Sequence, residues 1–355
     1  MRASAIFSEV CRNIRTGTSR SLLLTLVLAS LMTVLGVADI VSIASLEEKA
    51  ETFVDSGAAI RTVSLETRID PQSCDVLSSA ETVRASGAIA ATAPITLAAL
   101  PHGSIPAYSV TPSFASVLAL EPELAAGVWI PENLAEILHA GPGATVQTDT
   151  GTLEVGGVFA WPDDGRDRRL RYAILVPDAT LDRYDECWAA VWPTSDETDG
   201  LLRFAGTLGG ATDEPLTLAQ VNRNYGSSFD GHDEYTDRIT QHTLPVGAVV
   251  GFLIAFSSVR LRRLEYAGAL HAGQTRTAAA ATGLLETVVW CVAATVLATG
   301  ALLLTARGLS STGDLTSAAT SIRAAAATSA GALAGAATAL SLVRESHLFR
   351  YFKDR

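Results

Sequence analysis

Four long apolar segments divide the chain, one near the N-terminus and three in the C-terminal third. An α-helix needs about 20 mostly apolar residues to cross a hydrocarbon core of about 30 Å, and each segment reaches that length. The pattern therefore predicts four transmembrane helices, over residues 21–43, 239–259, 277–306 and 324–343. The first could instead be the apolar core of a signal peptide, but its apolar run is too long and no small-residue cleavage site closes it.

The fourth segment is the least hydrophobic of the four. It is rich in Ala and Gly, so a buried helix of a soluble domain is the alternative to a membrane span. The distribution of Arg favours the span, because loops rich in Lys and Arg stay in the cytoplasm. With four crossings, the basic stretches 1–20, 260–276 and 344–355 lie on the same side. Both termini and the 260–276 loop are therefore predicted to be cytoplasmic, in a multi-pass protein of the cell membrane.

The long segment 44–238 then lies outside the cell, and so does the short loop 307–323. Residues 144–161 alternate apolar and polar side chains around Thr150-Gly151, which predicts a β-hairpin. Residues 171–177 form a further strand pattern, and 131–141 predicts a helix with Pro131 in its first turn and Gly141 at its end. These elements predict an extracytoplasmic α+β domain inserted between the first two spans.

Two further stretches of the outer segment have a readable pattern. Residues 73–91 predict a short helix followed by a strand, whereas the polar stretch 193–238 predicts loops and a stalk that returns to the membrane. Cys74 and Cys187 both fall in the outer segment, where disulfides persist, so one bridge between them is predicted. The other two cysteines, Cys11 and Cys291, fall in the N-terminal stretch and the third span.

Composition agrees with this division of the chain. The mean hydropathy is +0.28 although the formal net charge is −11, as expected where apolar and acidic residues occupy different segments. The acidic balance gives no reason to expect a nucleic-acid partner. A lipid bilayer is the partner that the four apolar segments require.

No enzymatic motif stands out along the chain. It has no G-x-x-x-x-G-K-[ST] loop, no G-x-S-x-G elbow, no H-E-x-x-H pair and no C-x-x-C pair. We therefore expect a non-catalytic subunit with no cofactor of its own. An acidic cluster could ligate a divalent cation, although a solvated linker beside the membrane is the preferred interpretation. Its members are Asp230, His232, Asp233, Glu234 and Asp237.

Glu286 is the one acid well inside the third apolar segment. Acids within the membrane are candidates for a functional role, such as a part in transport. Glu286 is also only ten residues beyond Arg276, so an ion pair with an Arg of the cytoplasmic loop is an equal alternative. Two G-x-x-x-G pairs, which allow helices to approach closely in lipid, are candidates for helix packing. They are Gly247 with Gly251, and Gly331 with Gly335.

The cytoplasmic stretch RRLEYAGALHAGQTR, residues 262–276, predicts a short basic helix that Gly273 can end. From its physical properties it is either a docking surface for a soluble partner or a loop that only sets topology. It resembles the signature loop of the FtsX/MacB-type permease family, commonly R-R-E-hydrophobics-R-A-x-G-A-x-R. The matching residues are Arg262, Arg263, Glu265, Gly273 and Arg276, whereas Tyr266, Leu270 and His271 depart from the pattern.

The likeness to this family extends over nearly the whole chain. Residues 110–162 are similar to its extracytoplasmic domain, and the order of one span, a large outer domain and three spans is the same. In that family an amphipathic N-terminal helix lies along the inner membrane surface. Residues 3–15 fit such a helix, because Ile6, Val10 and Ile14 share one side.

The resemblance implies a permease subunit of a type VII ABC transporter. Such subunits form homo- or heterodimers with a second permease subunit, above two copies of an ABC ATPase subunit that bind ATP and Mg. The 262–276 loop would contact the ATPase, and ATP-driven motion would be transmitted to the outer domain. The implied activity is export or extraction of a peptide, antibiotic or lipid-linked substrate. The alternative is an FtsX-like regulator whose outer domain activates a cell-wall enzyme, with an extracytoplasmic protein or peptide as partner.

Overall fold

The computed structural model describes residues 3–98, 103–120, 127–207, 216–309 and 316–347 of the 355-residue chain. Parts of the predicted outer loop 307–323, of the tail 344–355 and of the outer segment 44–238 lie outside these ranges. The chain divides into two compact units. One is helical and contains residues 1–48 and 231–355, and the other is built on a sheet and contains residues 49–230.

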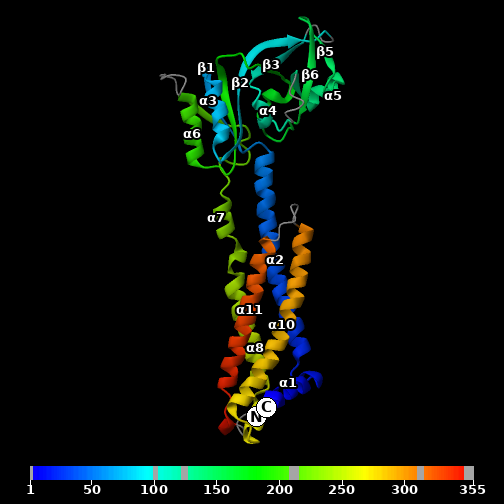
Figure 1. Cartoon of the computed structure of the whole chain (residues 1–355), viewed down its shortest axis with the longest axis vertical. Coiled ribbons are helices and arrows are strands. Elements are labelled where there is room, and N and C mark those ends of the chain that lie inside the picture. The colour runs from blue at the N-terminus through cyan, green and yellow to red at the C-terminus, as the bar shows by residue number, and fades with distance from the viewer. Residues whose placement is uncertain (1–2, 99–102, 121–126, 208–215, 310–315, 348–355) are drawn as a thin grey trace. The chain divides into compact units, whose positions relative to one another are not determined.

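The helical unit contains a set of long apolar helices (Figure 1). Four described helices are long and apolar enough to cross a membrane, and the last is the least hydrophobic, with a hydropathy of 1.2 against 1.9–2.3 for the others. They are α2 (Ser21–Asp55), α8 (Thr243–Leu261), α10 (Arg276–Leu309) and α11 (Thr316–Ser341). Shorter helices are α1 (Ala3–Arg15), α7 (Gly231–Thr236), η4 (Ile239–His242), α9 (Arg263–His271) and η5 (Glu345–His347).

The α2 and α10 helices extend beyond the predicted spans, whereas α8 begins at Thr243 instead of residue 239 and α11 ends at Ser341 instead of residue 343. The α2 helix was expected to end at residue 43 but continues to Asp55. The added stretch, ASLEEKAETFVD, is rich in Ala, Leu, Glu and Lys, which have high helix propensity, so it continues the helix although it is polar. The hydropathy that defines a span therefore does not mark the end of the helix.

The predicted helix-packing glycines face one another across α8 and α11. A Cβ at Gly251 would overlap the backbone carbonyl of Thr328, and one at Gly331 would overlap that of Ala248. In the same way, a Cβ at Gly335 would overlap the backbone carbonyl of Phe252, and a Cβ at Gly247 would overlap the hydroxyl of Thr328. The two G-x-x-x-G pairs thus form a single intrachain contact, in which the absence of side chains lets the two backbones meet.

A polar contact joins two of the long helices, α2 and α11, to the residue before η4 at the opposite end of the helical unit from α9. The carboxylate of Asp39 on α2 lies 3.3 Å from the Nε atom of Arg238, which precedes η4. The hydroxyl of Thr320 on α11 donates to the other Asp39 oxygen at 3.3 Å. Asp39 is buried and Arg238 is nearly so, so the one acid in the first apolar segment is compensated by a cation.

The sheet unit has one nine-stranded sheet, in the order β5-β6-β4-β7-β3-β2-β8-β1-β9. Most neighbouring strands are antiparallel, whereas β3 with β7 and β4 with β6 are parallel. The strands are β1 (Ile60–Ile69), β2 (Val83–Thr96), β3 (Ser104–Val110), β4 (Val128–Pro131), β5 (Thr145–Gln147), β6 (Thr152–Phe159), β7 (Ile174–Pro177), β8 (Tyr184–Val191) and β9 (Thr217–Gln220). Its helices are α3 (Pro71–Val76), η1 (Leu77–Ser79), α4 (Phe114–Val117), α5 (Glu132–Leu138), η3 (Arg168–Tyr172) and α6 (Asp196–Thr207).

Several outer elements agree with the sequence pattern. The β5–β6 hairpin pairs Gln147 with Thr152 around the predicted turn. The helix and strand expected within 73–91 are α3 and β2. Between the first two long helices the chain therefore forms the α+β domain that the pattern predicts.

Two outer expectations are wrong in detail. The helix predicted to end at Gly141 ends at Leu138, because His139 adopts the left-handed conformation with φ 47° and caps it. Only 174–177 of the strand pattern 171–177 pairs, since η3 lies just before it. The polar stretch 193–238 contains α6 and the edge strand β9 in addition to loops.

A disulfide joins Cys74 of α3 to Cys187 of β8, with a Cα–Cα distance of 5.7 Å. The bridge fixes the α3 helix to the central strands of the sheet across 113 residues of sequence. On the sheet, Trp188 packs against Phe114 and Trp161 at ring-centroid distances of 5.3 and 6.2 Å. These buried aromatic rings form the centre of a large hydrophobic cluster in the sheet unit.

Candidate functional site

The loop between the second and third long helices is built around a short helix. The α8 helix ends at Leu261, Arg262 takes a bridging conformation, and α9 begins at the next residue. Gly273 has φ +91°, a left-handed conformation that glycine adopts without steric cost, and it ends the turn that follows α9. The chain then enters α10 at Arg276. The sequence therefore forms the predicted short helix between two long ones.

Arg262 is the centre of a polar cluster at this corner. Its Nη1 atom donates to Glu286 of α10 at 2.5 Å, and its Nε atom donates to Glu265 of α9 at 2.9 Å. Its guanidinium also lies 5.2 Å from the centre of the Tyr266 ring. The side chain of Glu286 is only 4% exposed, against 52% for Glu265. Glu286 is therefore the buried anion that balances the Arg262 charge.

Asn13 brings the N-terminal helix into the same cluster. Its side-chain amide donates to the second Glu286 oxygen at 2.7 Å. The Val10 side chain is buried and those of Ile6 and Ile14 are half-buried, so the apolar side of α1 is the packed one. Gly17, with φ 76°, lies in the turn that joins α1 to α2. We define the coupling cluster as Asn13, Arg262, Glu265, Tyr266 and Glu286.

The electrostatics of the coupling cluster favour a fixed ion pair. Burial by itself disfavours the charge of Arg262, but Tyr266, Glu286 and Glu265 raise the pKa of its guanidinium above the ordinary value. Burial raises the pKa of Tyr266 to about 12, so its phenol stays neutral at physiological pH. Neither Arg262 nor Tyr266 therefore releases a proton near neutral pH, so these two groups fit a structural connection better than acid–base catalysis.

The remaining predicted loop residues lie around the coupling cluster without joining it. Arg263 is half-buried on α9, and Gly273 has open space where a Cβ would stand. Arg276 is exposed at the start of α10. The sequence pattern did not single out Asn13 as a partner of Glu286, or Tyr266 as a partner of Arg262. An amphipathic helix followed by Gly17 was the only available signal for the packing of α1 against α10.

The acidic cluster before the second long helix shows no metal-binding geometry. Within the ranges that the structure describes, no group of three or more His, Cys, Asp or Glu side chains could hold a metal ion. Asp233 and Glu234 instead occupy the first turn of α7, where negative side chains interact favourably with the positive end of the helix dipole.

The sheet unit contains a partly buried ion pair of its own. Both terminal nitrogens of Arg169 donate hydrogen bonds to the Glu186 carboxylate at 2.6 Å, and the guanidinium lies 5.3 Å from the centre of the Trp188 ring. Burial opposes the charge, but the bonds to Glu186 raise the pKa of Arg169 above its ordinary value. The pair holds η3 against β8, so we interpret it as structural.

Comparisons with known proteins give only weak likenesses, all of them to solved structures. No protein-family model matches the chain, and no curated protein matches it. Among solved structures, the periplasmic region of MacB from Actinobacillus actinomycetemcomitans matches with a TM-score of 0.36 and 13% sequence identity. The match covers 49% of this chain and 94% of that one. At this level the likeness does not establish a family.

Proposed function

We propose that the chain is the permease subunit of an ABC transporter of the MacB/FtsX mechanotransmission type. It crosses the cell membrane four times, with both termini and α9 in the cytoplasm and the sheet unit outside. A separate ATPase subunit, present in two copies, binds ATP and Mg, and a second permease subunit completes the complex. The complex exports or extracts a peptide, antibiotic or lipid-linked substrate.

The coupling cluster is the observation that carries this proposal. Arg262 and Glu265 belong to the loop that resembles the family's ATPase-contacting loop, and both bond within the cluster. Glu286 joins that loop to a long helix, and Asn13 joins it to α1. A force applied to α9 from the cytoplasm is therefore passed to α10 and α1 through buried, charge-assisted contacts. Such contacts are stronger than neutral hydrogen bonds and fix geometry as well.

The topology can be tested with single cysteines in a background in which Cys11→Ser and Cys291→Ala remove the free thiols. Ser227 and Ala272 are both exposed, so each position is accessible to a reagent. We expect Ser227→Cys to react with a membrane-impermeant maleimide in intact cells, and Ala272→Cys to react only after permeabilisation. The reverse labelling pattern would show that the chain is inserted in the opposite orientation.

Docking of the ATPase can be tested by purifying the tagged full chain from its native cell. We expect a subunit with a P-loop to co-purify. Glu265→Arg reverses a half-exposed charge on α9, and like charges at an interface cost several kcal/mol, so recovery of that subunit should fall more than about tenfold. Arg307→Glu, an exposed reversal at the other end of α10, is the matched control. Equal recovery with both variants would remove α9 as the docking element.

A further inference from the structure

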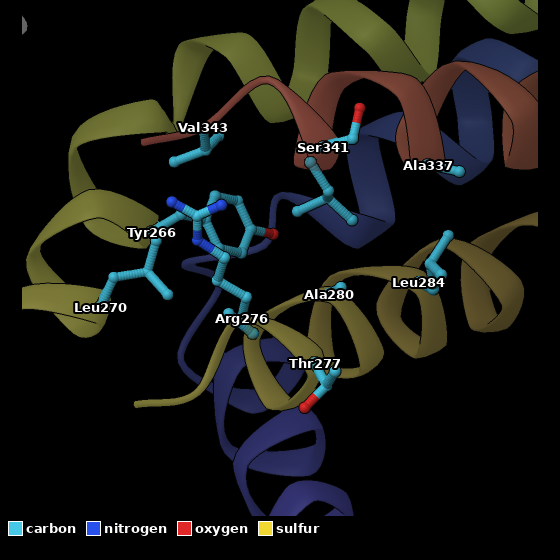
Figure 2. Close-up of a pocket in the computed structure, with 11 residues that line it drawn as sticks. Tyr266, Leu270, Arg276, Thr277, Ala280, Leu284, Ala337, Ser341 and Val343 are labelled. Carbon is cyan, nitrogen blue, oxygen red and sulfur yellow. The ribbon is translucent and has the colours of Figure 1, made fainter. Parts of the chain in front are cut away.

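A groove lies between α10 and α11 at the end of these helices nearest to α9 (Figure 2). Its volume is about 290 Å³, close to the lower limit of ordinary ligand pockets. Its long walls come from Ala280 and Leu284 of α10 and from Ala337 of α11. Leu270 of α9 lines it at the loop end. The groove belongs wholly to the helical unit.

The groove exists because its walls carry small side chains. Ala280 and Ala337 present only methyl groups, and Ser341 and Thr277 are little larger. In the same helix, Gly331 and Gly335 let α11 pack directly on the α8 backbone. The small residues that make the fourth apolar segment weakly hydrophobic therefore have two consequences. They allow α11 to contact α8 closely, and they leave the groove between α11 and α10 unfilled.

Charge is distributed unevenly at the groove. Among the residues that the structure describes, Arg276 is the only charged one that lines the groove, and its side chain is exposed. Within the described ranges, Arg276 has no carboxylate partner, whereas Arg262 is neutralised by Glu286 and Glu265. The groove thus combines apolar walls with one uncompensated cation at its loop end. That combination is complementary to a molecule with an apolar chain and an anionic group.

We propose that this groove binds one anionic phospholipid of the cytoplasmic leaflet, with an acyl chain along Ala280, Leu284 and Ala337 and the phosphate on Arg276. The inference rests on the proposed membrane topology, which puts the loop end of the groove at the depth of the cytoplasmic headgroups. Basic pockets between membrane helices on that side are suited to anionic headgroups. The bound chain replaces solvent or neutral lipid against apolar walls.

The position of the groove favours a lipid over a side chain of a partner protein. Its walls belong to two helices that are apolar enough to lie in hydrocarbon, and these walls include residues a full turn or more inside α10. A soluble partner would have to enter the bilayer to reach Leu284, whereas an acyl chain is already there. The lipid would also pack between α9 and α11, next to the coupling cluster.

The test uses the purified full chain without any ATPase, in mixed micelles with a photoreactive acyl-chain lipid. Phosphatidylglycerol and phosphatidylcholine with the same acyl chains are compared, and cross-linked peptides are located by mass spectrometry after chymotryptic digestion. We expect cross-links in 277–284 and 337–343 with phosphatidylglycerol to exceed those with phosphatidylcholine about fivefold, the effect of one basic residue near an anionic headgroup.

Three variants separate the charge from the groove. Arg276→Gln should reduce the phosphatidylglycerol cross-links to the phosphatidylcholine level, and Ala337→Leu should reduce both by filling the groove. Arg323→Gln removes an exposed charge near the other end of α11 and should leave the preference unchanged. Equal labelling by the two lipids, or a preference that survives Arg276→Gln, would overturn the proposal.

A second arm tests the protein alternative and keeps this inference separate from the proposed function. A photoreactive amino acid at Leu284, in the complex isolated from the native cell, should cross-link to lipid. Cross-linking to another polypeptide would overturn the lipid assignment while leaving the permease function standing. Conversely, if the chain cross-links selectively to phosphatidylglycerol but no ATPase co-purifies with it, the lipid site is supported and the proposed function is not.

Discussion

Glu286→Leu is expected to lower the stability of the full chain by about 3–5 kcal/mol and, in the proposed complex, to abolish stimulation of the ATPase subunit. The substitution leaves Arg262, whose side chain is 12% exposed, without its buried counter-ion. It also leaves the Asn13 amide without an acceptor. Removing one member of a buried pair is costly because the remaining charge stays in a poorly solvated position. Stability is measured by denaturant unfolding in detergent, and coupling by ATP hydrolysis in the assembled complex.

The double variant Arg262→Leu/Glu286→Leu distinguishes stability from coupling. Replacing both members of a buried ion pair with apolar residues is often neutral or stabilising, so unfolding should return towards the wild-type midpoint. ATPase stimulation should remain lost, since α9 and α10 no longer share a directional contact. Glu47→Leu removes an exposed carboxylate from α2 and serves as the control. Full stimulation by the double variant would show that the cluster only stabilises the fold.

The sequence singled out the cluster residue of α10, Glu286, but not the cluster residue of α1, Asn13. Glu286 stands out in an apolar segment, and a loop Arg was one of two expected explanations for it. The sequence could not say which Arg, because the choice depends on the change in chain direction at Arg262, between α8 and α9. Asn13 gave no signal, since one Asn on a polar helix face is ordinary. Only the return of α1 onto α10 makes it a partner.

The outer unit shows the same limit on a larger scale. The β5–β6 hairpin was predictable because its pairing is local and its turn residues are typical. The order of the nine strands was not, since β1 with β8 and β3 with β7 pair across long stretches of sequence. A period-two pattern identifies a strand but carries no information on its distant neighbour. The position of Cys74 beside Cys187 follows from that long-range pairing.

The glycines of α11 provide the second large effect. Gly331→Ala with Gly335→Ala should destabilise the helical unit by about 1–3 kcal/mol for each substitution, as expected for overpacking. The new methyl groups would overlap the backbone carbonyls of Ala248 and Phe252, which cannot move by a rotamer change. The two helices must therefore separate. Unfolding of the full chain in detergent, followed by circular dichroism, measures the effect.

Gly300→Ala is the matched control, because it makes the same change within α10 where a Cβ meets nothing within 4 Å. Alanine favours a helix over glycine by about 1 kcal/mol, so this variant should be as stable as the wild type or more so. If the α11 double variant were equally stable, the close approach of α8 and α11 would be wrong. Because this contact uses the α11 glycines within one chain, the second permease subunit of the proposed complex would pack against other faces of the helices.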